Sequence, residues 1–190
     1  MVTQQEAREA LGDVHDASTA MRRALADGGA SLVLIIWGAI WLVGFLLDYL
    51  LPVSTGWRWL ALGIIGAVAT FAIFRRYPVR NTVARRVSAF WFMLGAYGFL
   101  WLMVIAKASP RPVTVTGPQF GAYIVTLTMF AYVVMGLWLR SALLFWLGLA
   151  VTGIAAAALF LIEPHFSLVM AFAGGGALIA SGLGMRRWRR

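Results

Sequence analysis

After a polar segment of about thirty residues, long apolar runs dominate the chain and are separated by short segments rich in arginine, proline or glycine. A helix rises about 1.5 Å per residue, so each run can cross the roughly 30 Å of hydrocarbon in a bilayer. The pattern predicts six membrane spans, at about residues 32–51, 58–75, 89–107, 119–139, 142–162 and 165–185. We expect helices in these spans because lipid offers no partner to a backbone N–H group.

The first thirty residues predict a different element. Thr3 and Glu6 have the spacing of a capping box. Small or apolar residues then recur at alternating steps of four and three from Ala7 to Leu25, which is typical of an amphipathic helix. We therefore expect an all-α integral membrane protein with a cytosolic amphipathic helix in residues 1–30. Residues 31–190 would form a bundle of six transmembrane helices.

Composition supports the membrane class. The chain is 62% hydrophobic and 12% charged, with a mean hydropathy of +0.84. A soluble domain of 190 residues needs more polar surface to cover its core. The chain has no cysteine, so a disulfide framework, a thiol nucleophile and a thiolate metal site are all excluded.

The net charge of +9 comes from basic segments between the spans. With a cytosolic N-terminus, one side of the membrane carries most of the arginines, and the other carries Arg58, Lys107 and Arg111. Basic loops remain in the cytosol, so both termini are expected there, with the bundle in a bacterial inner membrane. The strongest anchor is a loop with five arginines: Arg75, Arg76, Arg80, Arg85 and Arg86.

This arginine loop has two further interpretations. It could bind anionic lipid headgroups, because each basic residue near the leaflet contributes about 1 kcal/mol. It could also bind an acidic protein or the N-terminal segment, which holds five of the seven acidic residues of the chain: Glu6, Glu9, Asp13, Asp16 and Asp27. Nucleic acid is not an expected partner, since the loop has neither a reading helix nor a stacking platform.

A polar cluster is expected at the outer face, formed by Asp48, Glu163 and His165. Two carboxylates and an imidazole suit a metal site or a proton-sensitive switch. The three residues show no ligand spacing, so pairing of the carboxylates with Arg58, Lys107 or Arg111 is favoured. The sequence assigns no catalytic residue, cofactor or metal. The middle of each span lacks ionisable side chains, which argues against a pump built on a buried carboxylate.

Small residues recur at steps of four in the last two spans. One row is Gly148, Thr152 and Ala156, and the others are Ala173-Ala177-Ser181 and Gly176-Ala180-Gly184. Such rows let helix backbones approach closely. Packing of the fifth span on the sixth is favoured, and a seam between two copies is the alternative. The triplet Gly174-Gly175-Gly176 could also form a hinge.

A weak internal repeat aligns Trp59, Gly66 and Ala69 with Trp146, Gly153 and Ala156. It would relate two inverted halves of three helices, as in many transporters. The sequence as a whole favours a non-enzymatic regulatory or sensor protein, or an accessory subunit of a membrane complex. The alternative is a small transporter or channel for a neutral or lipid-like solute. An enzyme acting on lipid ranks third because it would normally show clustered His, Asp or Glu residues at one membrane interface.

Overall fold

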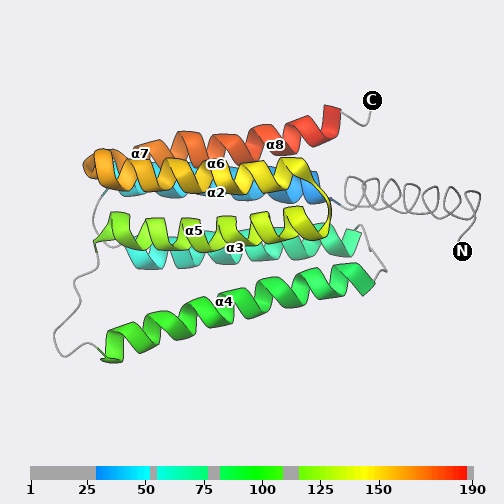
Figure 1. Cartoon of the computed structure of the whole chain (residues 1–190), viewed down its shortest axis with the longest axis horizontal. Coiled ribbons are helices and arrows are strands. Elements are labelled where there is room, and N and C mark those ends of the chain that lie inside the picture. The colour runs from blue at the N-terminus through cyan, green and yellow to red at the C-terminus, as the bar shows by residue number, and fades with distance from the viewer. Residues whose placement is uncertain (1–28, 52–54, 77–81, 109–115, 188–190) are drawn as a thin grey trace, which may run out of the picture.

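The structure of the chain is a computed structural model that describes residues 29–51, 55–76, 82–108 and 116–187. Throughout these ranges the backbone is helical apart from short turns and helix ends, with no strand. The predicted amphipathic helix lies outside the described residues. The elements drawn in Figure 1 are α2 (Ala30–Leu50), α3 (Thr55–Arg76), α4 (Thr82–Ala108), α5 (Gly117–Trp138), α6 (Ala142–Leu161), η1 (Glu163–His165), α7 (Phe166–Val169), η2 (Met170–Gly175) and α8 (Gly176–Arg187).

Five stretches of the described chain are long and apolar enough to cross a membrane. They are α2, α3, α5, α6 and the continuous helix Glu163–Arg187. In the region of the predicted third span, the described part of α4 gives a shorter apolar stretch, Ala89–Trp101. The all-helical fold class is confirmed, and the five long helices match the predicted spans to within a few residues at each end.

Helices α5 and α6 form a tight antiparallel hairpin. Their connection contains Arg140, which has a left-handed backbone with φ of 50°, and Ser141, whose hydroxyl caps α6 by accepting from the N–H of Leu144. Glycines bring the two backbones together: a Cβ on Gly136 would lie 2.5 Å from the backbone nitrogen of Phe145. Gly148 is equally close to α5. This glycine of the predicted row therefore faces α5, and other residues of α6 contact α7, η2 and α8.

Helix α2 is the centre of the bundle and contacts α3, α7, η2 and α8. Figure 1 shows α6 and α8 on one side of the bundle and α4 at its opposite edge, where α4 inclines away from α5. The interior is filled by apolar side chains from α2, α5, α6 and the last helix. Those with at most 1% exposure are Val125, Met129, Val151, Phe166, Met170 and Leu178, together with several alanines. Helix association in lipid depends on such close van der Waals packing.

The closest contact of α2 is with the last helix. A Cβ on Gly175 would lie 2.8 Å from the carbonyl oxygen of Gly38, and a Cβ on Gly182 would lie 2.7 Å from the carbonyl oxygen of Ser31. Real Cβ atoms essentially never approach backbone this closely, so a side chain at either position would force the two helices to shift apart. The seam between the first and last helices is thus built on small residues.

Within the monomer, the row Gly176-Ala180-Gly184 does not make this seam. Added Cβ atoms on Gly176 and Gly184 would meet nothing within 4 Å, and Ala180 is exposed. The reason is the π-helical turn η2, which the sequence reasoning did not foresee. This turn displaces the buried face of the last helix by one residue, so that Gly175 and Gly182 meet α2. At the glycine triplet the helix is widened and remains continuous, without a break.

The residues aligned by the weak repeat occupy unequal positions. Gly66 in α3 is buried against Trp37 and Ile40 of α2, whereas Gly153 in α6 has open space around it. Only 6% of the apolar window of α3 is buried, compared with 28% for α6. The second helices of the two halves are therefore packed differently, which removes the structural support for an inverted repeat.

Candidate functional site

One end of the bundle carries a polar clamp made by Asp48, Arg58 and Trp59. Asp48 is in the last turn of α2, and the other two residues are in the first turns of α3. The indole Nε1 of Trp59 donates to Oδ2 of Asp48 at 2.6 Å. The guanidinium of Arg58 lies 3.6 Å from Oδ1 of the same carboxylate. The expected interfacial pairing of Asp48 with Arg58 is therefore present.

Arg58 also caps the C-terminal end of α2. Its two terminal nitrogens donate to the carbonyl oxygens of Leu47 at 3.0 Å and Leu51 at 2.5 Å. The last carbonyl groups of a helix lack partners within the helix and carry partial negative charge, so a cation is favoured there. One arginine thus neutralises a carboxylate and completes a helix end. The side chains of Asp48 and Arg58 are only 13% and 16% exposed.

Aromatic rings continue the clamp into the bundle. The ring of Trp59 meets Phe45 edge-on with centroids 4.8 Å apart, and Phe45 in turn meets Phe166 of α7 at 6.1 Å. Gly44 makes room for the indole, because a Cβ there would lie 2.8 Å from it. The sequence alone placed Trp59 only in the weak internal repeat. The signal for its role is its position beside Arg58, just across a short connection from Asp48.

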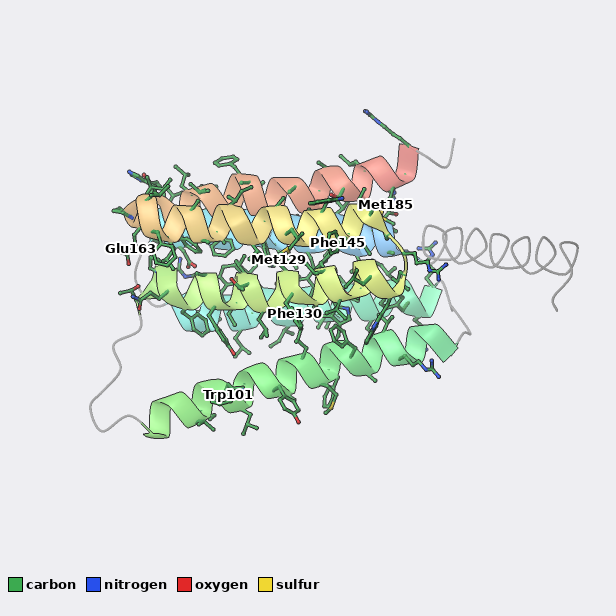
Figure 2. The ribbon with its side chains drawn as sticks, in the orientation of Figure 1. Trp101, Met129, Phe130, Phe145, Glu163 and Met185 are labelled. Atoms are coloured by element: carbon green, nitrogen blue, oxygen red, sulfur yellow. The ribbon has the colours of Figure 1, made fainter. Side chains whose placement is uncertain are left out.

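The other two members of the predicted outer cluster lie at the same end with separate partners. The hydroxyl of Thr116 donates to Oε1 of Glu163 at 3.4 Å (Figure 2). The ring of His165 lies beside that of Tyr49, with centroids 6.0 Å apart. Among the described residues, no group of three or more His, Cys, Asp or Glu side chains could hold a metal ion. The three predicted residues share an end of the bundle without forming one site.

The opposite end is basic. Arg75 and Arg76 occupy the last turn of α3 and are exposed, as is Arg86 in α4. Arg80 and the side chain of Arg85 lie outside the described part of the chain. Figure 1 shows the C-terminal ends of α3, α5 and α8 together at this end, so it also receives Arg140, Arg186 and Arg187. Both described acidic residues are at the other end, which makes the charge strongly asymmetric along the bundle.

Few polar groups lie within the described spans, and two of them bond to a neighbouring helix. The indole of Trp37 in α2 donates to the hydroxyl of Thr70 in α3 at 3.1 Å. The hydroxyl of Tyr123 in α5 donates to the backbone carbonyl of Gly98 in α4 at 3.3 Å. These bonds connect neighbouring helices side to side and do not line a passage.

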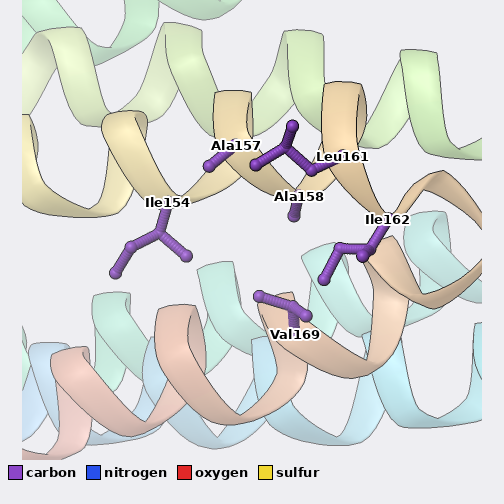
Figure 3. Close-up of a pocket in the computed structure, with 6 residues that line it drawn as sticks. All are labelled: Ile154, Ala157, Ala158, Leu161, Ile162 and Val169. Atoms are coloured by element: carbon purple, nitrogen blue, oxygen red, sulfur yellow. The ribbon is translucent and has the colours of Figure 1, made fainter.

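A shallow groove of about 240 Å³ lies between α6 and α7 (Figure 3). Aliphatic side chains line it: Ile154, Ala157, Ala158, Leu161, Ile162 and Val169. Small-molecule pockets usually enclose roughly 300–1,000 Å³ and include a few convergent polar groups. This groove is smaller than that range and lacks such groups, so its chemistry suits only an apolar chain.

Helix α4 presents a surface of exposed aromatic and apolar side chains. It lies against α5 through ring contacts at one end, with Phe90 against Trp138 at 5.2 Å and Trp91 against Tyr132 at 5.8 Å. Toward its C-terminal end it diverges from α5 (Figure 1). Large side chains on it are more than half exposed: Phe92, Met93, Tyr97, Phe99, Leu100 and Trp101.

The chain matches no protein-family model, no curated protein and no solved structure. Its class therefore rests on its own features. It is an all-helical protein whose long apolar helices indicate a membrane location. One end of the bundle is clamped by an aspartate, an arginine and a tryptophan, and the other end is basic.

Proposed function

We propose that the chain is a six-helix integral membrane protein that acts through contacts, as a regulatory or sensor protein or as an accessory subunit of a membrane complex. The observation that carries this proposal is the incomplete packing of α4. The contact face of this helix runs through Trp91, Leu94 and Gly98 at helical spacing and continues to Trp101. That tryptophan is nevertheless 58% exposed (Figure 2).

A polar group on α4 favours a protein partner over lipid alone. Tyr97 lies within the apolar stretch of α4 and is 59% exposed, and the described residues give its hydroxyl no hydrogen bond. Lipid tails cannot satisfy a hydroxyl, whereas a backbone carbonyl or polar side chain on a neighbouring helix can. Aromatic residues are also enriched where proteins bind each other. A transmembrane helix of a partner, packed against Tyr97 and Trp101, would satisfy both features.

A transport function has weaker support. The described spans bring no ionisable side chains together at mid-depth, the centre of the bundle is filled, and the groove at α6 is small and apolar. Catalysis likewise lacks a cluster of acids, bases or nucleophiles among the described residues. A passage or reaction centre would need at least one of these features.

The orientation proposed from the basic loops agrees with the charge asymmetry of the bundle. The end with Arg75, Arg76 and Arg86 would face the cytosol of a bacterium, beside anionic headgroups that attract it. A cysteine introduced at Glu163 should then react with a membrane-impermeant maleimide in intact cells. A cysteine at Arg187 should react only after lysis. Equal reaction of both before lysis would overturn this orientation.

The contact function is tested by photo-crosslinking in native membranes. A photoreactive phenylalanine analogue at Tyr97 or Trp101 should give one adduct of defined mass. The same analogue at Phe160, an exposed aromatic position on α6, is the matched control and should give none. An adduct of twice the mass of the chain would identify a second copy as the partner. No adduct from either α4 position would refute the proposal, and solute flux through the purified protein in liposomes would then support transport.

A further inference from the structure

The last helix carries a π-helical turn at one of its close contacts with α2, where Gly175 meets Gly38. In a regular helix of 3.6 residues per turn, a buried face that begins at Phe166 and Met170 continues through Ala173, Ala177 and Ser181. The observed buried positions are instead Gly174, Leu178 and Gly182. The π turn Met170–Gly175 accommodates one extra residue and so displaces the buried face by one.

At the position of Gly175, the displaced and the regular faces both allow close approach to α2. The π turn could become regular α-helix while α7 stayed in place. Each position on α8 would then be occupied by the residue that precedes its present occupant in the sequence. We call the place that a residue occupies against α2 its seat. Gly175 has a tight seat, because a Cβ there would lie 2.8 Å from backbone atoms of Gly38 and Leu42. In the regular helix, Gly174 would occupy this seat. The triplet therefore supplies a glycine at this seat in either register.

We propose that the last helix is a two-register element, with the observed π register and an α register in which α8 is turned by about 100°. Packing favours the π register. In the α register Ala177 would occupy the seat of Leu178, and Ser181 would occupy the tight seat of Gly182 beside Ser31. A change of register would turn Arg186 and Arg187 about the helix axis at the basic end. A change of register inside the bundle would therefore rearrange the arginine side chains that the basic end exposes.

A single glycine-to-alanine substitution in the triplet should favour one register over the other. Gly175→Ala blocks the π register, because its Cβ meets the backbone of Gly38 and Leu42, but it would be free in the α register at the open seat of Gly176. Gly174→Ala has the opposite effect. In the π register its Cβ meets only the flexible end of Met170 at 2.7 Å and the ring of Trp41 at 3.3 Å, whereas in the α register it would strike the tight seat. Gly176→Ala is the matched control.

The absence of cysteine makes the register measurable by paired spin labels. Labels at Trp146→Cys on α6 and Leu183→Cys on α8 occupy exposed positions at the same end of the bundle. A side chain about 5–6 Å from the helix axis moves by about 8 Å when the helix turns by about 100°. Double electron–electron resonance in lipid bilayers measures the distance between the two labels. Gly174→Ala should give a single distance. The native chain and Gly176→Ala should give the same distance as their major peak. Gly175→Ala should move the peak by up to about 8 Å.

The same distance in Gly174→Ala and Gly175→Ala would overturn the two-register helix. A variant with Gly176 deleted guards against a failure of Gly175→Ala to fold. Removing one residue converts the π turn to regular α-helix, and α8 keeps the same side against α2. This variant should therefore fold and give the same spin-label distance as Gly174→Ala. Loss of the folded bundle on this deletion would mean that the π turn is needed for itself, and it would equally refute the proposal.

Discussion

The clamp between α2 and α3 is the feature whose energetics follow most directly from its geometry. Asp48→Ala removes the acceptor of the Trp59 indole and the carboxylate that faces Arg58. A hydrogen bond to a charged group contributes about 1.5–3 kcal/mol. The ion pair at 3.6 Å has a Coulomb ceiling of about 4.6 kcal/mol at an effective dielectric constant of about 20. Desolvation offsets much of that ceiling.

We expect Asp48→Ala to lower the free energy of unfolding by about 3 kcal/mol, toward the lower end of the range for broken buried pairs. The value is moderated because Arg58 keeps the carbonyl groups of Leu47 and Leu51 as acceptors. The measurement is reversible unfolding in mixed micelles by increasing the fraction of a denaturing detergent. Trp57→Phe, at a position 70% exposed on the same helix turn, is the control and should change stability by less than about 0.5 kcal/mol.

A double-mutant cycle isolates the indole bond. Trp59→Phe keeps an aromatic ring beside Phe45 and removes the N–H donor together with the indole atoms that pack at Gly44, and the cycle subtracts that packing loss. In the cycle with Asp48→Ala, the coupling energy should be about 1.5–3 kcal/mol. Additivity of the two single variants to within about 0.5 kcal/mol would show that the carboxylate and the indole do not act as a unit, and the reasoning for the clamp would fail.

Three smaller effects follow from other contacts. Gly182→Ala should cost about 1–3 kcal/mol in the same assay because its Cβ would overlap Ser31, whereas Gly184→Ala should be neutral; equal effects would contradict the assigned seam. The Trp37–Thr70 bond should show a coupling of about 0.6 kcal/mol between Trp37→Phe and Thr70→Val, and no coupling would mean that it does not form. Arg140→Gly should stabilise the hairpin by about 1 kcal/mol because it removes the Cβ from a left-handed residue, and destabilisation would contradict that source of strain.

The sequence predicted the helices well because apolar runs in lipid have few structural options. It also predicted the pairing of Asp48 with Arg58, since a helix end and the next helix start must lie near each other across a short connection. It could not predict the seam at Gly175 and Gly182. Small residues occur on several faces of the last helix, and one π turn decides which face is buried.

The poor attachment of α4 was equally invisible in the sequence. Its aromatic residues are as apolar as those of α5 or α6, and hydropathy does not distinguish a helix side that meets protein from one that meets lipid. The exposure of Tyr97 and Trp101 depends on the inclination of the helix, which is set by contacts at its other end. Tertiary packing therefore identified the candidate surface that the residue pattern alone did not.

The pairing of α2 with α8 also determines the order in which the bundle can be completed. These helices are the first and last of the described chain, and glycines of the last helix meet α2 between Ser31 and Leu42. At about 5–20 residues per second, a ribosome needs roughly ten to thirty seconds to travel from one to the other. During that interval the glycine face of α2 has no permanent partner in the nascent chain. We expect chains truncated after residue 165 to be degraded faster in pulse–chase experiments than full-length chains, and equal lifetimes would show that α2 is stable in lipid alone.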